Sequence, residues 1–158
     1  MESNRTVVAL LNNQLTRELT AVNQYFLHAR MYQHWGLGKL GEKEYHESID
    51  EMKHADKLTQ RILMLDGLPN FQDLGKINIG ENAPEMLMAD LGVEKGAQVS
   101  LKEGIAHCES VNDYVSREIL VEILDDTEDH IDWIETQLGL IDRVGLQNYL
   151  QTQMTPAS

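Results

Sequence analysis

Four long segments of this sequence repeat apolar residues at alternating spacings of three and four positions, and no proline interrupts them. The three prolines, Pro69, Pro84 and Pro156, all lie outside the interiors of these segments, and Pro84 falls in the first turn of the third. Such spacing places the apolar side chains on one face of an α-helix. It therefore predicts an all-α fold. The predicted helices span about residues 5–35, 39–66, 83–111 and 113–138.

The chain is expected to form a single domain, because 158 residues with 42% apolar side chains can bury one core. Gly139 is the expected end of the fourth helix. A short fifth helix is expected at about residues 146–151, with too few apolar residues to fold alone, so it should dock on this chain or on a neighbour. Residues 152–158 are expected to form a disordered tail.

Residues 67–82 lack any periodicity and contain several glycine and proline residues. At about 3.3 Å per residue this stretch can reach about 50 Å. The second helix is about 42 Å long at a rise of about 1.5 Å per residue. The loop can therefore cross the full length of the bundle, which would make the second and third helices parallel, as in four-helix bundles with one long connection.

Composition excludes several classes of protein. The formal net charge of −13 argues against a nucleic-acid-binding protein, which would carry a basic patch or tail. No apolar run approaches about 18 residues, so no membrane span is expected, and the first residues do not resemble a signal peptide. The single Cys108 cannot form an intramolecular disulfide. These features predict a cytoplasmic protein.

Carboxylates occur within the apolar faces of the predicted helices. Glu18 and Glu94 lie in the stripes of the first and third helices, and Glu51 and His54 lie one turn apart in the second. A buried carboxylate is unfavourable unless it is paired or bound to a metal. Salt bridges across the bundle, or a solvated row of charges, would be the alternative explanations.

The fourth helix contributes His130, with Thr127 three residues before it. One Glu from each of two helices and a Glu-x-x-His from each of the other two form the di-iron pattern of four-helix bundles. Thr127 stands where that pattern has a glutamate. Carboxylate and imidazole groups suit iron, manganese or zinc, so the sequence predicts a metal site with one ligand missing.

Four stretches make the chain resemble the bacterioferritin family from about Thr6 to Leu150. They are residues 23–26 (NQYF), 45–55 (YHESIDEMKHA), 67–70 (GLPN) and 136–140 (TQLGL). The resemblance implies a ferritin-like four-helix bundle with one long crossover loop and a short fifth C-terminal helix. It also implies a hollow 24-subunit shell that oxidises ferrous iron and stores the ferric mineral, with haem b between subunit pairs.

The resemblance extends to individual residues. The family's ferroxidase ligands match Glu18, Glu51, His54, Glu94 and His130. Met52 matches the axial haem ligand, and otherwise would pack at a dimer interface. His46 and Asp50 match an iron site on the inner surface, and otherwise would be a solvated polar pair. Tyr25 would either donate an electron during oxidation or hydrogen-bond a ligand.

Thr127 departs from the family, in which this position is a glutamate that bridges both irons. A threonine hydroxyl is neutral and too short to bridge, so impaired ferroxidase activity is expected. Asp126 and Glu128 flank it, but each is turned about 100° from the ligand face, so either would need a local helix distortion to replace the glutamate. Glu47 on the second helix is another candidate substitute.

Two functional hypotheses follow from the resemblance. In the first, the chain is an iron-storage subunit whose own ferroxidase centre, using dioxygen or peroxide, is impaired, in a homomeric shell or one shared with a second bacterioferritin subunit type. In the second, it is a non-catalytic, haem-carrying subunit that accepts electrons from a bacterioferritin-associated ferredoxin. Leu68, Lys76 and Glu81 would then be docking residues. The acidic charge disfavours a DNA-protecting mini-ferritin, and the single cysteine disfavours a rubrerythrin-like peroxidase.

Overall fold

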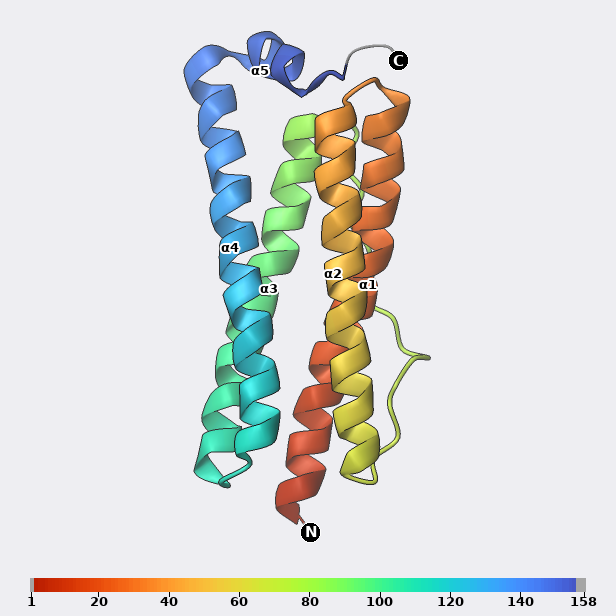
Figure 1. Cartoon of the computed structure of the whole chain (residues 1–158), viewed down its shortest axis with the longest axis vertical. Coiled ribbons are helices and arrows are strands. Elements are labelled where there is room, and N and C mark those ends of the chain that lie inside the picture. Colours follow the sequence, from red (N-terminus) through yellow and green to blue (C-terminus); the bar gives the residue numbers. More distant parts are fainter. Residues whose placement is uncertain (1, 156–158) are drawn as a thin grey trace.

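The computed structural model describes the backbone of residues 2–155 and the side chains of residues 4–155, and this part of the chain contains helices and no strands. The helices are α1 (Glu2–His34), α2 (Gly38–Met64), α3 (Ala83–Ser110), α4 (Tyr114–Val144) and α5 (Leu146–Gln153). The four long helices lie side by side, and α5 crosses one end of the bundle (Figure 1). The predicted all-α, ferritin-like bundle is therefore confirmed.

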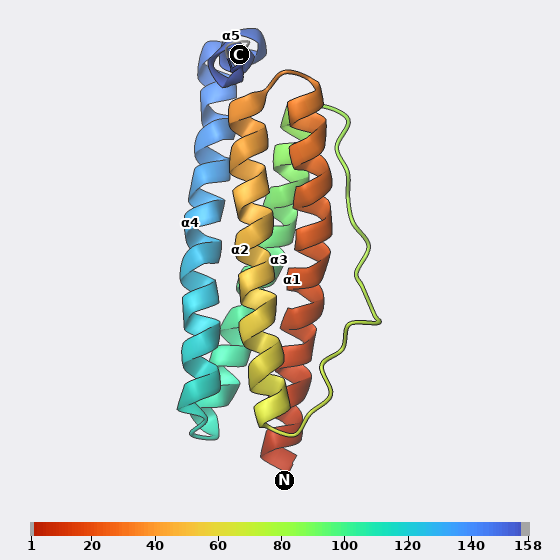
Figure 2. The ribbon, with the colours of Figure 1, turned by 45° about the vertical axis from the view of Figure 1, so that its right-hand side comes forward.

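The long connection between α2 and α3 runs along the outside of α1 from one end of the bundle to the other (Figure 2). Side chains of α1 hold it by accepting hydrogen bonds from its backbone. Thr20 accepts from the backbone nitrogen of Gly75 at 2.9 Å, and Gln24 accepts from that of Asn78 at 2.9 Å. These bonds satisfy backbone groups that the loop cannot pair within itself, and the crossover makes α2 and α3 parallel.

The apolar core is divided into two ends. One end contains Leu11, Leu58 and Ile123, and the other contains Tyr32 and Tyr149. The Tyr149 side chain of α5 is buried, and its hydroxyl donates to Gln137 Oε1 at 2.7 Å. The fifth helix therefore docks on its own chain. Between the two apolar ends, the buried side chains of all four long helices are mostly polar.

The end of the fourth helix was predicted at the wrong glycine. Gly139 lies inside α4, which continues to Val144, and Gly145 follows it with a positive φ of 86°. A glycine inside a helix costs only about 1 kcal/mol, and Leu138 and Ile141 beside it pack against the core. Burial of these side chains offsets that cost.

The predicted C-terminal tail is shorter than expected. Thr152 and Gln153 belong to α5 rather than to a disordered segment. Residues 156–158 of the predicted tail lie outside the described residues. The predicted break between the third and fourth helices occurs at Asn112, which has a φ of 60°, and Asp113 caps α4.

Candidate metal centre

The structure brings the five predicted ligands together in the polar middle of the bundle. They are Glu18, Glu51, His54, Glu94 and His130, and each is at most 6% exposed. We call these five side chains the metal centre. They come from all four long helices, because each occupies a core-facing position one or more turns from apolar neighbours.

Three of these residues form the first position of the metal centre. One ligand atom each from Glu18, Glu51 and His54 lie within 4.8 Å of one another. His54 Nδ1 lies 3.5 Å from Glu18 Oε2 and 3.4 Å from Glu51 Oε2. Burial raises the pKa of Glu18, although hydrogen bonds with His54 and Gln14 oppose this shift. The first position thus has two carboxylates and one imidazole available to a divalent cation.

The other ring nitrogen of His54 contacts α4. His54 Nε2 lies 2.7 Å from Asp126 Oδ2. Burial alone would lower the pKa of His54, but hydrogen bonds with Glu18 and Asp126 and their charges raise it to about 9. From the sequence, Asp126 was considered only as a replacement for the missing glutamate, and this contact with His54, which α4 makes as a continuous helix, was not predicted.

The second position of the metal centre is formed around His130. Its Nδ1 lies 2.9 Å from Glu94 Oε1 and 3.5 Å from Glu47 Oε2. Ligand atoms of Glu47, Glu51 and His130 also lie within 4.8 Å of one another. Burial alone would lower the pKa of His130, but the hydrogen bond with Glu94 and the surrounding carboxylates raise it. Glu51 therefore belongs to both positions.

Tyr25 contacts the second position, and Thr127 lies on the same helix as His130. The Tyr25 hydroxyl donates to Glu94 Oε1 at 2.5 Å, and both side chains are buried. Burial and the nearby carboxylates raise the pKa of Tyr25 far above its ordinary value, so the phenol stays protonated. Thr127 is also buried, one turn before His130, and offers only a neutral hydroxyl at this position.

A separate buried cluster of His28, Glu44 and Asp90 lies outside the metal centre, and sequence reasoning did not identify it. His28 Nδ1 lies 2.9 Å from Asp90 Oδ1, and the backbone nitrogen of Gly80 donates to His28 Nε2 at 3.2 Å. Because Nε2 accepts a hydrogen bond, Nδ1 of a neutral His28 carries the proton and donates it to Asp90. Through Gly80 and Asp90 this cluster ties the crossover loop to α1 and α3.

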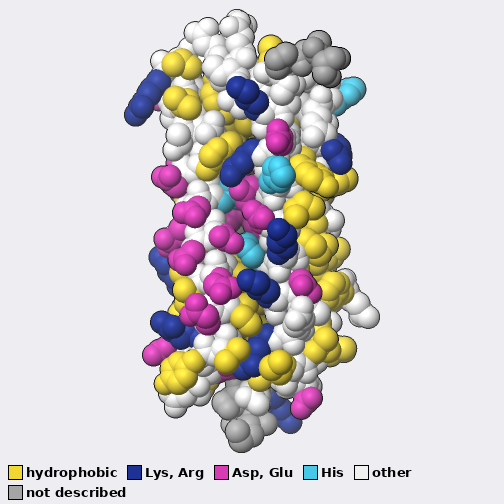
Figure 3. Space-filling view, viewed as in Figure 1, with side chains coloured by type: hydrophobic (Ala, Val, Ile, Leu, Met, Phe, Trp, Pro, Cys, Tyr) yellow, Lys and Arg dark blue, Asp and Glu magenta, His cyan; other side chains and the backbone are white. Residues whose placement is uncertain are grey.

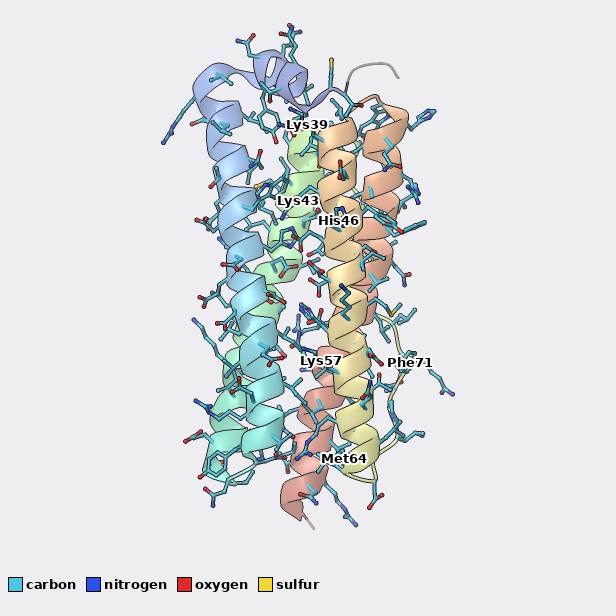
Figure 4. All side chains as sticks on the ribbon, viewed as in Figure 1. Lys39, Lys43, His46, Lys57, Met64 and Phe71 are labelled. Carbon is cyan, nitrogen blue, oxygen red and sulfur yellow. The ribbon has the colours of Figure 1, made fainter. Side chains whose placement is uncertain are left out.

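The remaining predicted site residues are on the surface of the subunit. Met52 is 47% exposed on the outward side of α2. His46 and Asp50 are both exposed and belong to none of the ligand groups within residues 4–155. His46, labelled in Figure 4, lies 3.8 Å from Glu42 through its Nε2 atom.

No helix in the described part of the chain is long and apolar enough to cross a membrane. On the face shown in Figure 3, acidic side chains gather over α4 and beside its seam with α2. Such a concentration of negative charge raises the local concentration of cations. The metal centre therefore lies beneath a surface that attracts positively charged ions.

Comparison with known proteins agrees with this geometry. Residues 8–144 match the family described as the ferritin-like domain. A bacterial ferritin from Pseudomonas aeruginosa is 50% identical over 155 residues, which cover 98% of this chain and 100% of the relative. A bacterial ferritin from Synechocystis sp. is 49% identical over 156 residues, with 98% and 100% covered. A bacterioferritin from Mycobacterium leprae is 46% identical over 149 residues, with 94% of each chain covered. The chain therefore belongs to the ferritin-like iron-storage family, among the bacterioferritins and bacterial ferritins.

Proposed function

We propose that this chain is the iron-storage subunit of a cytoplasmic, hollow 24-subunit shell and that it takes ferrous iron as its substrate at the metal centre. The observation that carries the proposal is the convergence of three carboxylates and two imidazoles in the buried middle of one subunit. Without bound cations these carboxylates would repel one another. The acidic surface over α4 supplies the attraction that draws ferrous ions to the subunit.

The reaction is oxidation of ferrous to ferric iron by dioxygen or peroxide. Two ferrous ions held close together supply two electrons, which with two protons reduce dioxygen to hydrogen peroxide or peroxide to water. The protein orients the ions and lowers the reorganisation that oxidation requires. Glu18, Glu51 and His54 serve the first ion, and Glu94 and His130 serve the second.

The second position is weaker than the first in this chain. The family's bridging glutamate is replaced by Thr127, whose side chain offers no negative charge. Within the five-residue metal centre, three carboxylates then face two ferrous ions that carry four positive charges. We therefore expect slower oxidation than in relatives that have the glutamate.

Haem b is proposed to bind between two subunits through Met52 of each. Thioether sulfur is an established haem ligand, and the outward Met52 side chain is suitably exposed. Ile49 lies one turn away on α2 and is also exposed, as is Phe26 on α1. The guanidinium of Arg30 lies over the rings of both Phe26 and Tyr45, which shows that these two helices share one outer face. This apolar face suits a flat, apolar cofactor.

An alternative function is favoured by the combination of Met52 and Thr127. In this alternative the chain is a haem-carrying, non-catalytic subunit that co-assembles with a ferroxidase-active bacterioferritin subunit. Electrons would enter from a bacterioferritin-associated ferredoxin, and exposed residues of the crossover loop are the proposed docking residues. They are Leu68, Lys76 and Glu81.

The experiment that tests the proposal is an anaerobic ferrous titration of the purified homomeric shell. A visible spectrum reports haem, and addition of dioxygen or peroxide then starts oxidation. Binding of ferrous iron at the subunit centre followed by measurable oxidation supports the storage function. Haem binding without ferrous binding or oxidation supports the alternative.

Two variants sharpen this test. Thr127→Glu restores the bridging carboxylate and should raise the oxidation rate strongly if the native centre is impaired. Glu18→Ala should abolish the residual rate. If the unmodified protein oxidises ferrous iron fast and Glu18→Ala abolishes that oxidation, the prediction of an impaired centre is overturned. The storage function is then still supported.

A further inference from the structure

We propose that Glu47 of α2 is a carboxylate ligand of the second iron position, beside Glu94. It would replace the glutamate ligand that this chain lacks because residue 127 is a threonine. This inference rests on the function proposed above and adds a ligand to it. In the family resemblance, the missing carboxylate would come from α4. In this chain it would come instead from the neighbouring helix α2.

The geometry places Glu47 at the second position. Its Oε2 atom lies 3.5 Å from His130 Nδ1, the same nitrogen that faces Glu94 at 2.9 Å. Glu47 also lies one helical turn before Glu51, so both carboxylates project from one side of α2. Ligand atoms of these two glutamates and of His130 lie within 4.8 Å of one another.

Glu51 connects the two positions. It shares one ligand group with Glu18 and His54 and the other with Glu47 and His130. A carboxylate with two oxygens in such a place can contact both ions. The two positions are therefore close enough for the ions to be oxidised together.

The charges support the same conclusion. With Glu18, Glu51 and Glu94 alone, three negative charges face the four positive charges of two ferrous ions. Glu47 supplies the fourth negative charge, so the loaded centre becomes neutral apart from its bound oxidant. A buried site that is neutral when loaded avoids the high cost of an uncompensated buried charge.

The other two candidates for the missing ligand are engaged elsewhere. Asp126 contacts the far nitrogen of His54 at 2.7 Å. Glu128 is exposed, and its Oε1 accepts a hydrogen bond from Gln98 at 3.4 Å. Neither side chain lies in a ligand group with His130 among the described residues.

In the metal-free subunit, Lys43 is the counter-charge of Glu47. Its Nζ atom lies 2.8 Å from Glu47 Oε1, so Oε2 is the oxygen that faces His130. Lys43 projects from α2 on the side of the seam with α4, where it also lies 5.1 Å from the ring of Trp133 (Figure 4). Partly exposed ion pairs of this kind contribute only about 0–1 kcal/mol, so Lys43 positions Glu47 without preventing it from binding a cation.

The test is a count of Co(II) bound per subunit in the full shell, followed anaerobically by the visible absorption of the bound metal. The unmodified shell should bind two Co(II) per subunit at the centre. Glu47→Gln should bind one, with the affinity of the first position unchanged. Glu42→Gln, an exposed glutamate on the same helix, should still bind two.

A second variant distinguishes the loss of a metal ligand from a purely structural effect of Glu47→Gln. Glu47→Gln combined with Thr127→Glu places the carboxylate back on α4 and should restore two Co(II) per subunit. Two Co(II) in Glu47→Gln alone, or one in the unmodified shell, would overturn the role of Glu47 while leaving iron storage possible. No Co(II) at the centre of the unmodified shell would overturn both the role of Glu47 and the ferrous site proposed above.

Discussion

His54 of α2 and Asp126 of α4 are joined by a hydrogen bond of 2.7 Å between His54 Nε2 and Asp126 Oδ2. The bond keeps a proton on Nε2, so Nδ1, which faces Glu18 and Glu51, is the ring nitrogen whose lone pair becomes available when a metal displaces its proton. A carboxylate that holds the far nitrogen of a ligating histidine fixes its orientation and raises its basicity. The fourth helix therefore supports the first position even though Thr127 gives no ligand to the second.

Replacing Asp126 should weaken the first position. Asp126→Ala removes the acceptor that orients His54, and losses of about 10- to 100-fold in metal affinity are typical when such a partner is removed. The measurement is anaerobic competition for Co(II) between the shell and a coloured chelator. Asp125→Ala, at the preceding exposed position, is the control. Equal affinities in the Asp126→Ala and unmodified proteins would contradict the positioning role of Asp126.

Tyr25→Phe separates the two roles that the sequence left open for Tyr25. The change removes the donor to Glu94 but keeps the ring, whose centroid lies 5.4 Å from that of His130. Hydrogen bonds to charged groups contribute about 1.5–3 kcal/mol. If Tyr25 acts by positioning Glu94, Co(II) binding at the second position should weaken roughly 10- to 100-fold.

The control for Tyr25→Phe is Tyr149→Phe, which removes another buried hydroxyl, the donor to Gln137, far from the metal centre. It should leave Co(II) binding unchanged. Unchanged Co(II) affinity in Tyr25→Phe together with slower ferrous oxidation would instead indicate electron donation by Tyr25.

The fold was largely predictable because its signals are local. Apolar spacing identifies each buried helical face, and proline and glycine interrupt it at the boundaries. The burial of the five predicted ligands was predictable for the same reason: a polar residue such as Glu18 or Glu94 in an otherwise apolar stripe must lie inside the bundle. Each of these inferences needs the register of only one helix.

Contacts between helices were not predictable in this way. The pairs His54–Asp126 and Glu47–His130 depend on how far apart α2 and α4 lie and how each is rotated. A position turned about 100° from the core face of its own helix can still reach the neighbouring helix with a carboxylate side chain. A projection of one helix shows the direction of each side chain but not how far it reaches towards a neighbouring helix. The contact of Asp126 with His54 was therefore missed.

Lowering the pH should remove the contribution that the Asp113 cap of α4 makes to the stability of the folded subunit. Asp113 accepts from the backbone nitrogen of Ser116 at 3.0 Å and from Arg61 at 2.9 Å. Burial alone would raise the pKa of Asp113, but these bonds lower it below its ordinary value. The folded state thus binds this proton less readily than the unfolded state, so the stabilisation is full above the unfolded pKa of about 4 and is lost as pH falls through the lower folded value.

Asp113→Asn keeps the shape and the capping oxygen but loses the charge, so it should lower the melting temperature at pH 7, with a loss of about 0.3–1 kcal/mol expected for a negative charge at a helix N-terminus. The difference from the unmodified protein should shrink at acid pH, once the pH has fallen through the lowered pKa of the native Asp113 carboxyl and that carboxyl is protonated too. Thermal unfolding at both pH values measures this. A difference of the same size at both pH values would show that the charge of Asp113 is not what stabilises the cap.

Two glycines near the end of α4 should respond in opposite ways to alanine. Gly139 lies in the helix interior, and a Cβ atom there would meet no atom within 4 Å. Gly139→Ala should therefore stabilise the subunit by about 1 kcal/mol, the difference in helix propensity. Gly145 has φ 86° and ψ 151°, a conformation that is essentially restricted to glycine. Gly145→Ala should destabilise the subunit by about 1–3 kcal/mol.

The two glycine variants are compared by thermal unfolding. Both are measured at the same subunit concentration, because assembly contributes to the apparent stability of a shell. A change of 1 kcal/mol shifts the melting temperature by about 2–4 °C for a chain of this size. The expected result is a rise for Gly139→Ala and a fall for Gly145→Ala. A fall for Gly139→Ala with no change for Gly145→Ala would place the end of α4 at Gly139, as the sequence alone had predicted. The opposite signs follow from the backbone conformation at each glycine, helical at Gly139 and restricted to glycine at Gly145, since neither added methyl group meets a neighbouring atom in the subunit.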